Sequence, residues 1–131
     1  MQVGMTTLIS GARDAAFVRD AERLGVTSVW VPETWGQDAL TPLAYLAGQT
    51  TSIRLGSSIA QLGARSPAMV AMSAMSLQLL SGGRFLLGLG VSGPPDSSCS
   101  DMADMATMAG DLAPSCAIDE PSLMLVVWPA R

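Results

Sequence analysis

Short apolar runs recur at a regular spacing along the first part of the chain. Each run is rich in β-branched or other apolar residues and is bounded by Gly, Pro or Ser, a pattern typical of buried strands. The runs cover residues 3–9, 27–31, 53–60 and 84–90, and strands are therefore expected to start near residues 3, 28, 54 and 84. Steps of 25, 26 and 30 residues predict parallel strands that alternate with helices.

Helix signals fill the three intervals between these runs. The pattern predicts helices over about 12–24, 41–49 and 66–80. Thr41-Pro42 and Ser66-Pro67 each offer an N-cap residue followed by proline at the first helical position. Gly25 is the expected left-handed residue after the first helix.

Helical spacing also selects the residues that should face the core. In the first helix the expected inner stripe is Phe17, Ala21 and Leu24. In the third helix, Met69, Met72 and Met75 are spaced three apart, and core packing is the favoured interpretation for them. Val70, Leu77 and Leu80 are expected to pack beside these methionines.

Two α/β folds fit this order of elements, a (β/α) barrel and a doubly wound open sheet. An eight-unit barrel needs roughly 250 residues, so four βα units would form half of one. We assign residues 1–94 to this α/β part and residues 95–131 to a divergent, irregular tail. The tail holds both cysteines and six of the eleven acidic residues, and it shows no clear strand or helix period.

Composition excludes several classes of site. The chain has no His, which rules out a His-dependent triad, a His-ligated zinc site or an imidazole base. Two cysteines make neither a disulfide framework nor a metal site, so no metal is expected. No basic face suggests nucleic acid, and no apolar run is long enough to span a membrane. A cytoplasmic protein is the expectation.

A glycine motif follows the fourth predicted strand. Residues 88–93 read Gly-Leu-Gly-Val-Ser-Gly and match the dinucleotide pattern G-x-G-x-x-G. That pattern requires a helix at its third glycine, whereas Pro94 and Pro95 follow at once and disfavour helical geometry. A Rossmann-like nucleotide-binding domain is therefore the weaker alternative. A strand end lined by glycine, which lets a flat cofactor approach the backbone, is the favoured interpretation.

Polar residues near two other strand ends are further candidates. Glu33 and Asp38 lie in the loop after the second strand, where residues of a barrel line the active site. Both also fit a solvated loop in which Asp38 or Thr41 caps the second helix. Ser57 and Ser58 interrupt an apolar strand, which indicates either a bulge with a ligand contact or hydroxyls that bond within the sheet.

Several of these stretches together resemble the luciferase-like monooxygenase family. They are residues 33–38 (Glu-Thr-Trp-Gly-Gln-Asp), residues 64–67 (Ala-Arg-Ser-Pro) and, most specifically, residues 80–94 (Leu-Ser-Gly-Gly-Arg-Phe-Leu-Leu-Gly-Leu-Gly-Val-Ser-Gly-Pro). The resemblance covers residues 1–94. It implies a TIM-barrel fold that binds FMN or a deazaflavin of the coenzyme F420 type, together with a small-molecule substrate, at the carboxyl ends of the strands.

The resemblance also implies roles for individual residues. It places a bulge with a non-proline cis peptide at Ser58-Ile59, against the flat ring of the cofactor. It assigns active-site positions to Glu33 and Thr34, where many members carry a His. The residues expected to bind the cofactor are Ser58, Ile59, Gln61, Gly90, Val91, Ser92 and Gly93.

From Pro95 onward the sequence departs from the family pattern. This break suggests the hypothesis of a truncated or frame-shifted copy of a flavin- or deazaflavin-dependent oxidoreductase. A non-catalytic half-barrel remnant is an alternative. In either case a second copy of the chain could close the barrel as a homodimer.

Overall fold

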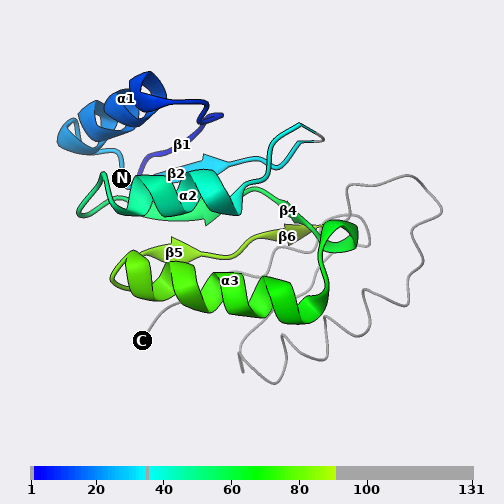
Figure 1. Cartoon of the computed structure of the whole chain (residues 1–131). Helices are drawn as coiled ribbons and strands as arrows, with labels where there is room; N and C mark the ends of the chain where they lie inside the picture. Colours follow the sequence, from blue (N-terminus) through cyan, green and yellow to red (C-terminus); the bar gives the residue numbers. More distant parts are fainter. Residues whose placement is uncertain (1, 35, 91–131) are drawn as a thin grey trace.

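Four parallel strands form the central sheet of the computed structural model, which describes residues 2–34 and 36–90 (Figure 1). They are β1 (Gly4–Thr6), β2 (Ser28–Val31), β3 (Arg54–Ser57) and β5 (Phe85–Leu86), and they lie in the order β1-β2-β3-β5. Each strand thus pairs with the next one along the chain. A doubly wound sheet reverses its direction partway, so this order is that of a barrel wall.

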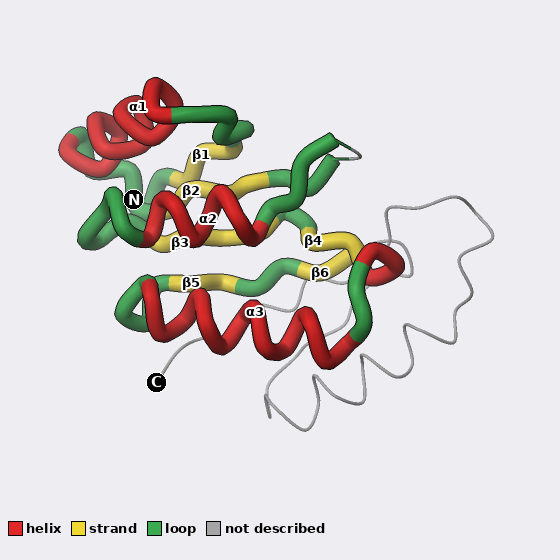
Figure 2. The backbone as a smooth tube through the Cα atoms, viewed as in Figure 1, coloured by secondary structure: helices red, strands yellow, loops and turns green. Residues whose placement is uncertain are grey.

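Three helices connect the strands (Figure 2). They are α1 (Ala12–Arg23), α2 (Leu40–Ala47) and α3 (Pro67–Leu80). Right-handed crossovers that all step in one direction place their helices on the same face of the sheet. Accordingly, Val29, Val31 and Leu55 from the strands and Val18 and Leu43 from the helices belong to one buried core.

The opposite face of the sheet carries a tryptophan over glycine. Trp30 is half-buried, and a side chain added at Gly56 would lie 2.2 Å from its ring. Gly4 is similarly restricted, since an added Cβ would lie 2.7 Å from the Ser28 hydroxyl. Glycine at these two strand positions therefore leaves room for the indole ring to lie close to the sheet.

The predicted third and fourth strands are each interrupted. After β3 the chain bulges at Ser58 and Ile59, whose peptide bond is cis, and pairing resumes at β4 (Ala60–Gln61). The fourth run likewise forms β5 and then β6 (Leu89–Gly90), which pairs with β4 in parallel. The expected cis peptide is confirmed at this position. The expectation of an unbroken fourth strand is wrong because its neighbour bulges.

The helix caps follow the sequence at most positions. Gly25, with φ 91°, ends α1, and its N–H and that of Val26 donate to the carbonyls of Glu22 and Ala21. This is the Schellman arrangement, which a left-handed residue permits. The Ser66 hydroxyl accepts from the Met69 N–H at 3.3 Å and caps α3 as predicted.

The predicted start of α2 at Thr41-Pro42 is wrong. The helix begins at Leu40, and its N-cap residue is Ala39. The Asp38 carboxylate takes the capping role by accepting from the Thr41 N–H at 2.7 Å. A side chain three residues before that donor can accept its hydrogen bond equally well. The Ser/Thr-Pro pattern alone therefore does not determine where the first turn of the helix begins.

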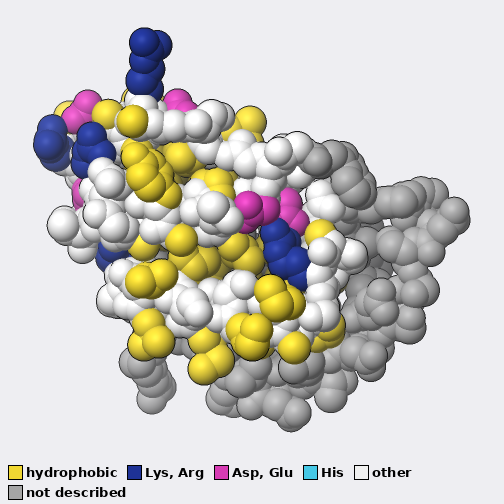
Figure 3. Space-filling view, viewed as in Figure 1, with side chains coloured by type: hydrophobic (Ala, Val, Ile, Leu, Met, Phe, Trp, Pro, Cys, Tyr) yellow, Lys and Arg dark blue, Asp and Glu magenta, His cyan; other side chains and the backbone are white. Residues whose placement is uncertain are grey.

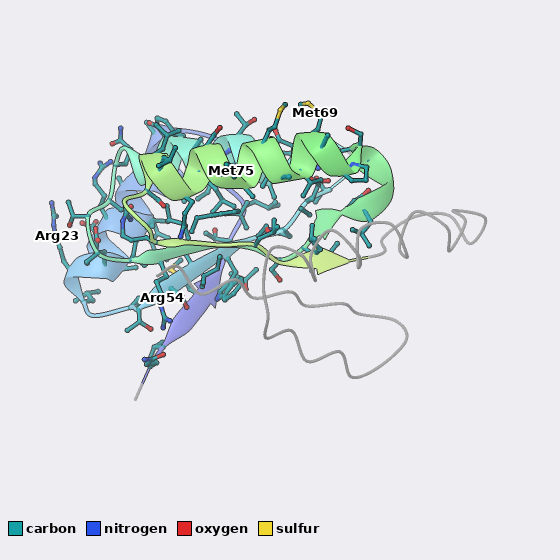
Figure 4. All side chains as sticks on the ribbon, turned by 90° about the horizontal axis from the view of Figure 1, so that it is seen from below. Arg23, Arg54, Met69 and Met75 are labelled. Atoms are coloured by element: carbon teal, nitrogen blue, oxygen red, sulfur yellow. The ribbon has the colours of Figure 1, made fainter. Side chains whose placement is uncertain are left out.

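Two predicted core stripes are only partly confirmed. In α1, Ala21 is buried as predicted, but Phe17 and Leu24 are exposed, and Ala15 and Val18 are the other buried residues of this helix. Met69, Met72 and Met75 lie on the outer face of α3, with exposed fractions of 49%, 57% and 63%. Hydrophobic side chains are visible along this helix in Figure 3, and Figure 4 shows Met69 on the side away from the sheet. Val70 and Leu77 form the buried face of α3, whereas Leu80 is exposed.

The Arg84 side chain donates hydrogen bonds to the segments that lead into β3 and β5. Its Nε donates to the Ser81 carbonyl at 2.7 Å, and its Nη1 donates to the Thr50 hydroxyl and the Ile53 carbonyl, both at 2.9 Å. Its Nη2 donates to the carbonyls of Ala47 at 3.0 Å and Thr50 at 3.1 Å. One planar guanidinium therefore satisfies carbonyls at the carboxyl ends of both α2 and α3.

Glu22 holds the turn that leads into β3. Its Oε1 accepts from the N–H groups of Thr51 at 3.0 Å and Ile53 at 2.9 Å, and from the N–H and the hydroxyl of Ser52. Burial opposes ionisation, but hydrogen bonds from Ile53, Ser52 and Thr51 outweigh it and lower the Glu22 pKa from 4.5 to about 2.

Within the described residues, no helix is long and apolar enough to cross a bilayer.

We predict that Arg84→Lys lowers the free energy of unfolding by about 2–4 kcal/mol, because an ammonium cannot satisfy the same set of carbonyls. Arg13→Lys, at an exposed position on α1, is the matched control and should change stability by less than about 0.5 kcal/mol. Urea unfolding of the two variants provides the measurement. Equal midpoints for both variants would contradict this role of Arg84.

We predict that part of the chain's stability depends on Glu22 ionisation. The folded-state pKa is depressed, so this contribution is complete above the ordinary value of 4.5 and is lost as pH falls toward about 2. Glu22→Gln should therefore reduce stability at neutral pH and flatten its decline in acid. Denaturant midpoints measured across this pH range give the comparison. Parallel curves for the variant and the original chain would show that Glu22 does not contribute.

Candidate functional site

The carboxyl ends of β2, β4 and β6 meet at one end of the sheet. β4 and β6 lie side by side, with Gln61 opposite Gly90 in the ladder (Figure 1). The bulge that precedes β4 is attached to β2, because the Ser58 N–H donates to the Val31 carbonyl at 2.9 Å. Residues from three parts of the sequence therefore converge where a barrel places its active site.

Glu33 lies at the centre of this convergence. Its Oε1 accepts from the Gln61 N–H at 3.1 Å and from Arg65 Nη1 at 2.7 Å. Its Oε2 accepts from the Ala39 N–H at 3.1 Å, and its own N–H donates to the Ile59 carbonyl at 3.3 Å. The side chain is only 4% exposed, so it contacts the β2–α2 loop, the bulge and β4 rather than solvent.

Electrostatics keep Glu33 ionised. Burial opposes the charge, but hydrogen bonds from Arg65, Ala39 and Gln61, together with the positive charge of Arg65, outweigh it and lower the Glu33 pKa. The same contact raises the pKa of Arg65. A second carboxylate, that of Asp38, lies 3.8 Å from Arg65 Nη2. Both partners of the pair are therefore charged at neutral pH.

The bulge places one small polar side chain and one apolar side chain at the end of the strand. Ser58 is exposed and Ile59 is half-buried. A side chain at Gly90 would lie 2.9 Å from Ile59 Cγ1, so glycine is needed for the two strands to approach here. Ser57 is fully buried, and its hydroxyl donates to the Gly88 carbonyl at 2.8 Å and accepts from the Gly88 N–H at 2.9 Å. For Ser57, bonding within the sheet is thus the observed arrangement.

The structure brings four of the predicted site residues into one cluster: Glu33, Ile59, Gln61 and Gly90. Ser58 adjoins it, and Thr34 is exposed beside it, with its backbone paired to Gln37. Val91, Ser92 and Gly93 lie outside the described residues, as does the predicted tail. The described part of the chain contains no cluster of three or more potential metal-binding acids or cysteines.

Arg65 is the residue that sequence reasoning missed. It sits one position before the N-cap of α3, within the stretch Ala-Arg-Ser-Pro that helped to suggest the family. Its partner Glu33 is 32 residues earlier in the chain. An opposite charge at such a separation gives no local signal, and only the β2–β3 pairing brings the two together.

Comparison with known proteins identifies the group to which this arrangement belongs. A family model described as luciferase-like monooxygenase matches residues 2–108. The chain belongs to this family. The match covers the described βα units and continues beyond Pro94, where the resemblance inferred from the motifs ended.

Two named relatives each match part of this chain. A Mycobacterium tuberculosis protein assigned as a coenzyme F420-dependent oxidoreductase is 52% identical over 80 residues, which cover 61% of this chain and 23% of that protein. The 5,10-methylenetetrahydromethanopterin reductase of Methanolobus tindarius is 38% identical over 77 residues, or 58% of this chain and 24% of the reductase. The chain thus spans about a quarter of the length of these relatives.

A solved structure supports the fold assignment. The oxygenating component of 3,6-diketocamphane monooxygenase from Pseudomonas putida, solved with FMN, aligns with a TM-score of 0.67 at 19% identity. The alignment covers 98% of this chain and 44% of that one. The chain therefore has the α/β architecture of part of a TIM barrel, with parallel strands that alternate with helices.

We predict that Gly90→Ala destabilises the chain by about 1–3 kcal/mol, because the new methyl group overlaps Ile59. Adding Ile59→Ala removes the Cγ1 and Cδ1 atoms nearest to it, so the double variant should be more stable than the sum of the single effects implies. Thermal unfolding of all four chains completes the cycle.

Gly63→Ala serves as the control for this cycle, since nothing lies within 4 Å of a Cβ at that position. Its effect should be small and independent of Ile59. Additive effects of Gly90→Ala and Ile59→Ala would mean that the two strands do not approach each other as the structure indicates.

Proposed function

We propose that this chain forms the β2, β4 and β6 part of a cofactor site in a deazaflavin-dependent oxidoreductase. The observation that carries the proposal is the convergence of Glu33, Ile59, Gln61 and Gly90 beside the exposed Ser58 at the carboxyl ends of the strands. The two relatives above are named for coenzyme F420 dependence or for reduction of a methylenetetrahydromethanopterin, which favours hydride transfer as the reaction class.

The residues present suit a flat aromatic ring. Ile59 offers an apolar side chain that is only half-buried, and Ser58 offers an exposed hydroxyl beside it. Gly90, opposite Gln61 in the ladder, has no side chain and so leaves room for Ile59 to lie at this strand end. When bound, a deazaflavin supplies hydride chemistry, and the protein supplies binding, orientation and exclusion of water.

Thr34 and Glu33 would have different polar roles at this site. Thr34 is exposed at the end of β2, where its hydroxyl can hydrogen-bond a small substrate. Glu33 is enclosed by protein donors and stays next to the bulge. We therefore assign substrate contact to Thr34 and support of the cofactor surface to Glu33.

FMN is the second candidate cofactor, since it occupies the structurally similar monooxygenase from Pseudomonas putida. That likeness lies in the fold, whereas the relative named for F420 dependence shares 52% sequence identity over 80 residues. Local sequence agreement bears more directly on which ring the site accepts, and the deazaflavin is the proposal for that reason.

Self-association is the proposed way to complete the barrel. In the part of the chain that the structure describes, the sheet ends in β1 on one side and β5 on the other, and open edges of this kind recruit further strands. A second copy contributes four more strands, which together make the eight of a barrel. The division of the chain into an α/β part, residues 1–94, and a tail, residues 95–131, also remains a prediction.

The test is a fluorescence titration of the purified 131-residue chain with coenzyme F420, FMN and NAD, with the mass measured by sedimentation. We expect micromolar binding of F420, weaker binding of FMN and none of NAD, with dimer as the bound form. Ser58→Trp should abolish binding by covering the proposed ring surface, whereas Ser76→Trp, at an exposed position on α3, should not. Binding of NAD alone, or of no cofactor by any assembled form, would overturn the proposal.

A further inference from the structure

We propose that Glu33 and Arg65 are positioning residues, which as an ion pair hold the bulge at Ser58 and Ile59, together with β4, in the shape that the cofactor surface requires. This inference rests on the proposed function for its purpose, but its structural part can be tested without any cofactor. It also gives Arg65 a functional role that sequence patterns did not indicate.

Glu33 is placed to support rather than to react. Both carboxylate oxygens already accept hydrogen bonds, and the side chain is 4% exposed. A general acid or base must come within hydrogen-bond reach of its substrate, and donors from the protein occupy that reach here. Glu33 therefore influences the reaction through the groups that it holds.

Those groups lie in the bulge and in β4, on either side of Ala60. The Glu33 N–H donates to the Ile59 carbonyl, and the Glu33 carboxylate accepts from the Gln61 N–H. A single residue at the end of β2 therefore fixes the backbone before and after Ala60. The bond from the Ala39 N–H to Oε2 adds the start of α2 to the same assembly. A shift of Glu33 must move Ile59, whose side chain contributes to the proposed ring surface.

Arg65 makes this arrangement possible. A buried carboxylate is costly unless it is paired and hydrogen-bonded, and Arg65 Nη1 lies 2.7 Å from Oε1. Arg65 itself is 19% exposed, so its charge remains partly hydrated while it neutralises Glu33. Asp38 lies farther away, at 3.8 Å, and caps α2, so it cannot replace Glu33 as the main partner.

Amide hydrogen exchange tests the structural part of the proposal. In Glu33→Gln the amide group places a donor toward the Gln61 N–H or the Ala39 N–H, and at least one bond is lost. We expect exchange at residues 58–61 to speed up by roughly tenfold or more, the loss expected for one charge-assisted hydrogen bond.

Glu22→Gln is the matched control for this experiment. Glu22 also accepts several backbone N–H groups, but it holds the turn before β3, at the opposite end of the strand. It should lower stability and speed exchange at residues 51–53 while leaving residues 58–61 unchanged relative to the rest of the sheet. Unchanged exchange at residues 58–61 in Glu33→Gln would overturn the proposal, whatever the cofactor result.

Cofactor affinity tests the functional part. F420 should bind Glu33→Gln roughly tenfold or more weakly than the original chain, and Glu22→Gln with nearly unchanged affinity. Arg65→Met should match the Glu33→Gln loss, Arg65→Lys should recover part of it by keeping the charge, and the double variant should lose little more than either single one.

The possible outcomes separate the two proposals. If the original chain binds F420 and Glu33→Gln binds it equally well, the positioning role is wrong and the proposed function stands. If the original chain does not bind F420, the proposed function fails, and the exchange experiment alone decides whether the pair fixes the bulge. Equal affinity losses in Glu22→Gln and Glu33→Gln would reduce the role of Glu33 to general stability and overturn the positioning role.

Discussion

The hydrogen bonds and the ion pair of the Glu33 carboxylate are the interactions on which the carboxyl-terminal end of the sheet depends. One buried charge satisfies N–H groups from the start of α2 and from β4, and Arg65 compensates its desolvation. Without the Glu33 carboxylate, the Gln61 N–H, which follows the bulge, would lose this hydrogen-bond acceptor. In the proposed role, an ion pair that need not touch the ligand therefore sets the geometry of the candidate site.

A similar solution appears at the other end of the strands. Glu22 accepts the N–H groups that lead into β3, and Arg84 donates to the carbonyls that end α2 and α3. Turns between helices and parallel strands leave backbone groups without ladder partners, and long charged side chains can reach several of them at once. In this sparsely charged chain, Glu22, Glu33, Arg65 and Arg84 thus make structural contacts.

The two faces of the sheet differ in how completely they are covered. Helices bury one face through Val29, Val31 and Leu55, whereas Trp30 lies half-buried on the other. The outer side of α3 exposes methionines, and within the described residues β1 and β5 are the edge strands of the sheet. A barrel wall that closes on further strands would cover the inner face and the edges, in keeping with the family to which the chain belongs.

The sequence by itself determined the number and order of the βα units, the caps at Gly25 and Ser66, and, through family resemblance, the cis peptide at Ser58-Ile59. These features depend on local patterns of polarity and on residues with special backbone preferences. The spacing of the elements left barrel and open sheet undecided, and the family resemblance implied the barrel. The strand order confirms it, because strand order depends on pairing between distant segments. Only the tertiary structure decided which helix faces are buried, since Ala15 and Val18 join the predicted Ala21 in the core while Phe17 and Leu24 are exposed. Finally, it joined Glu33 to Arg65 across 32 residues, a contact that no local pattern contains.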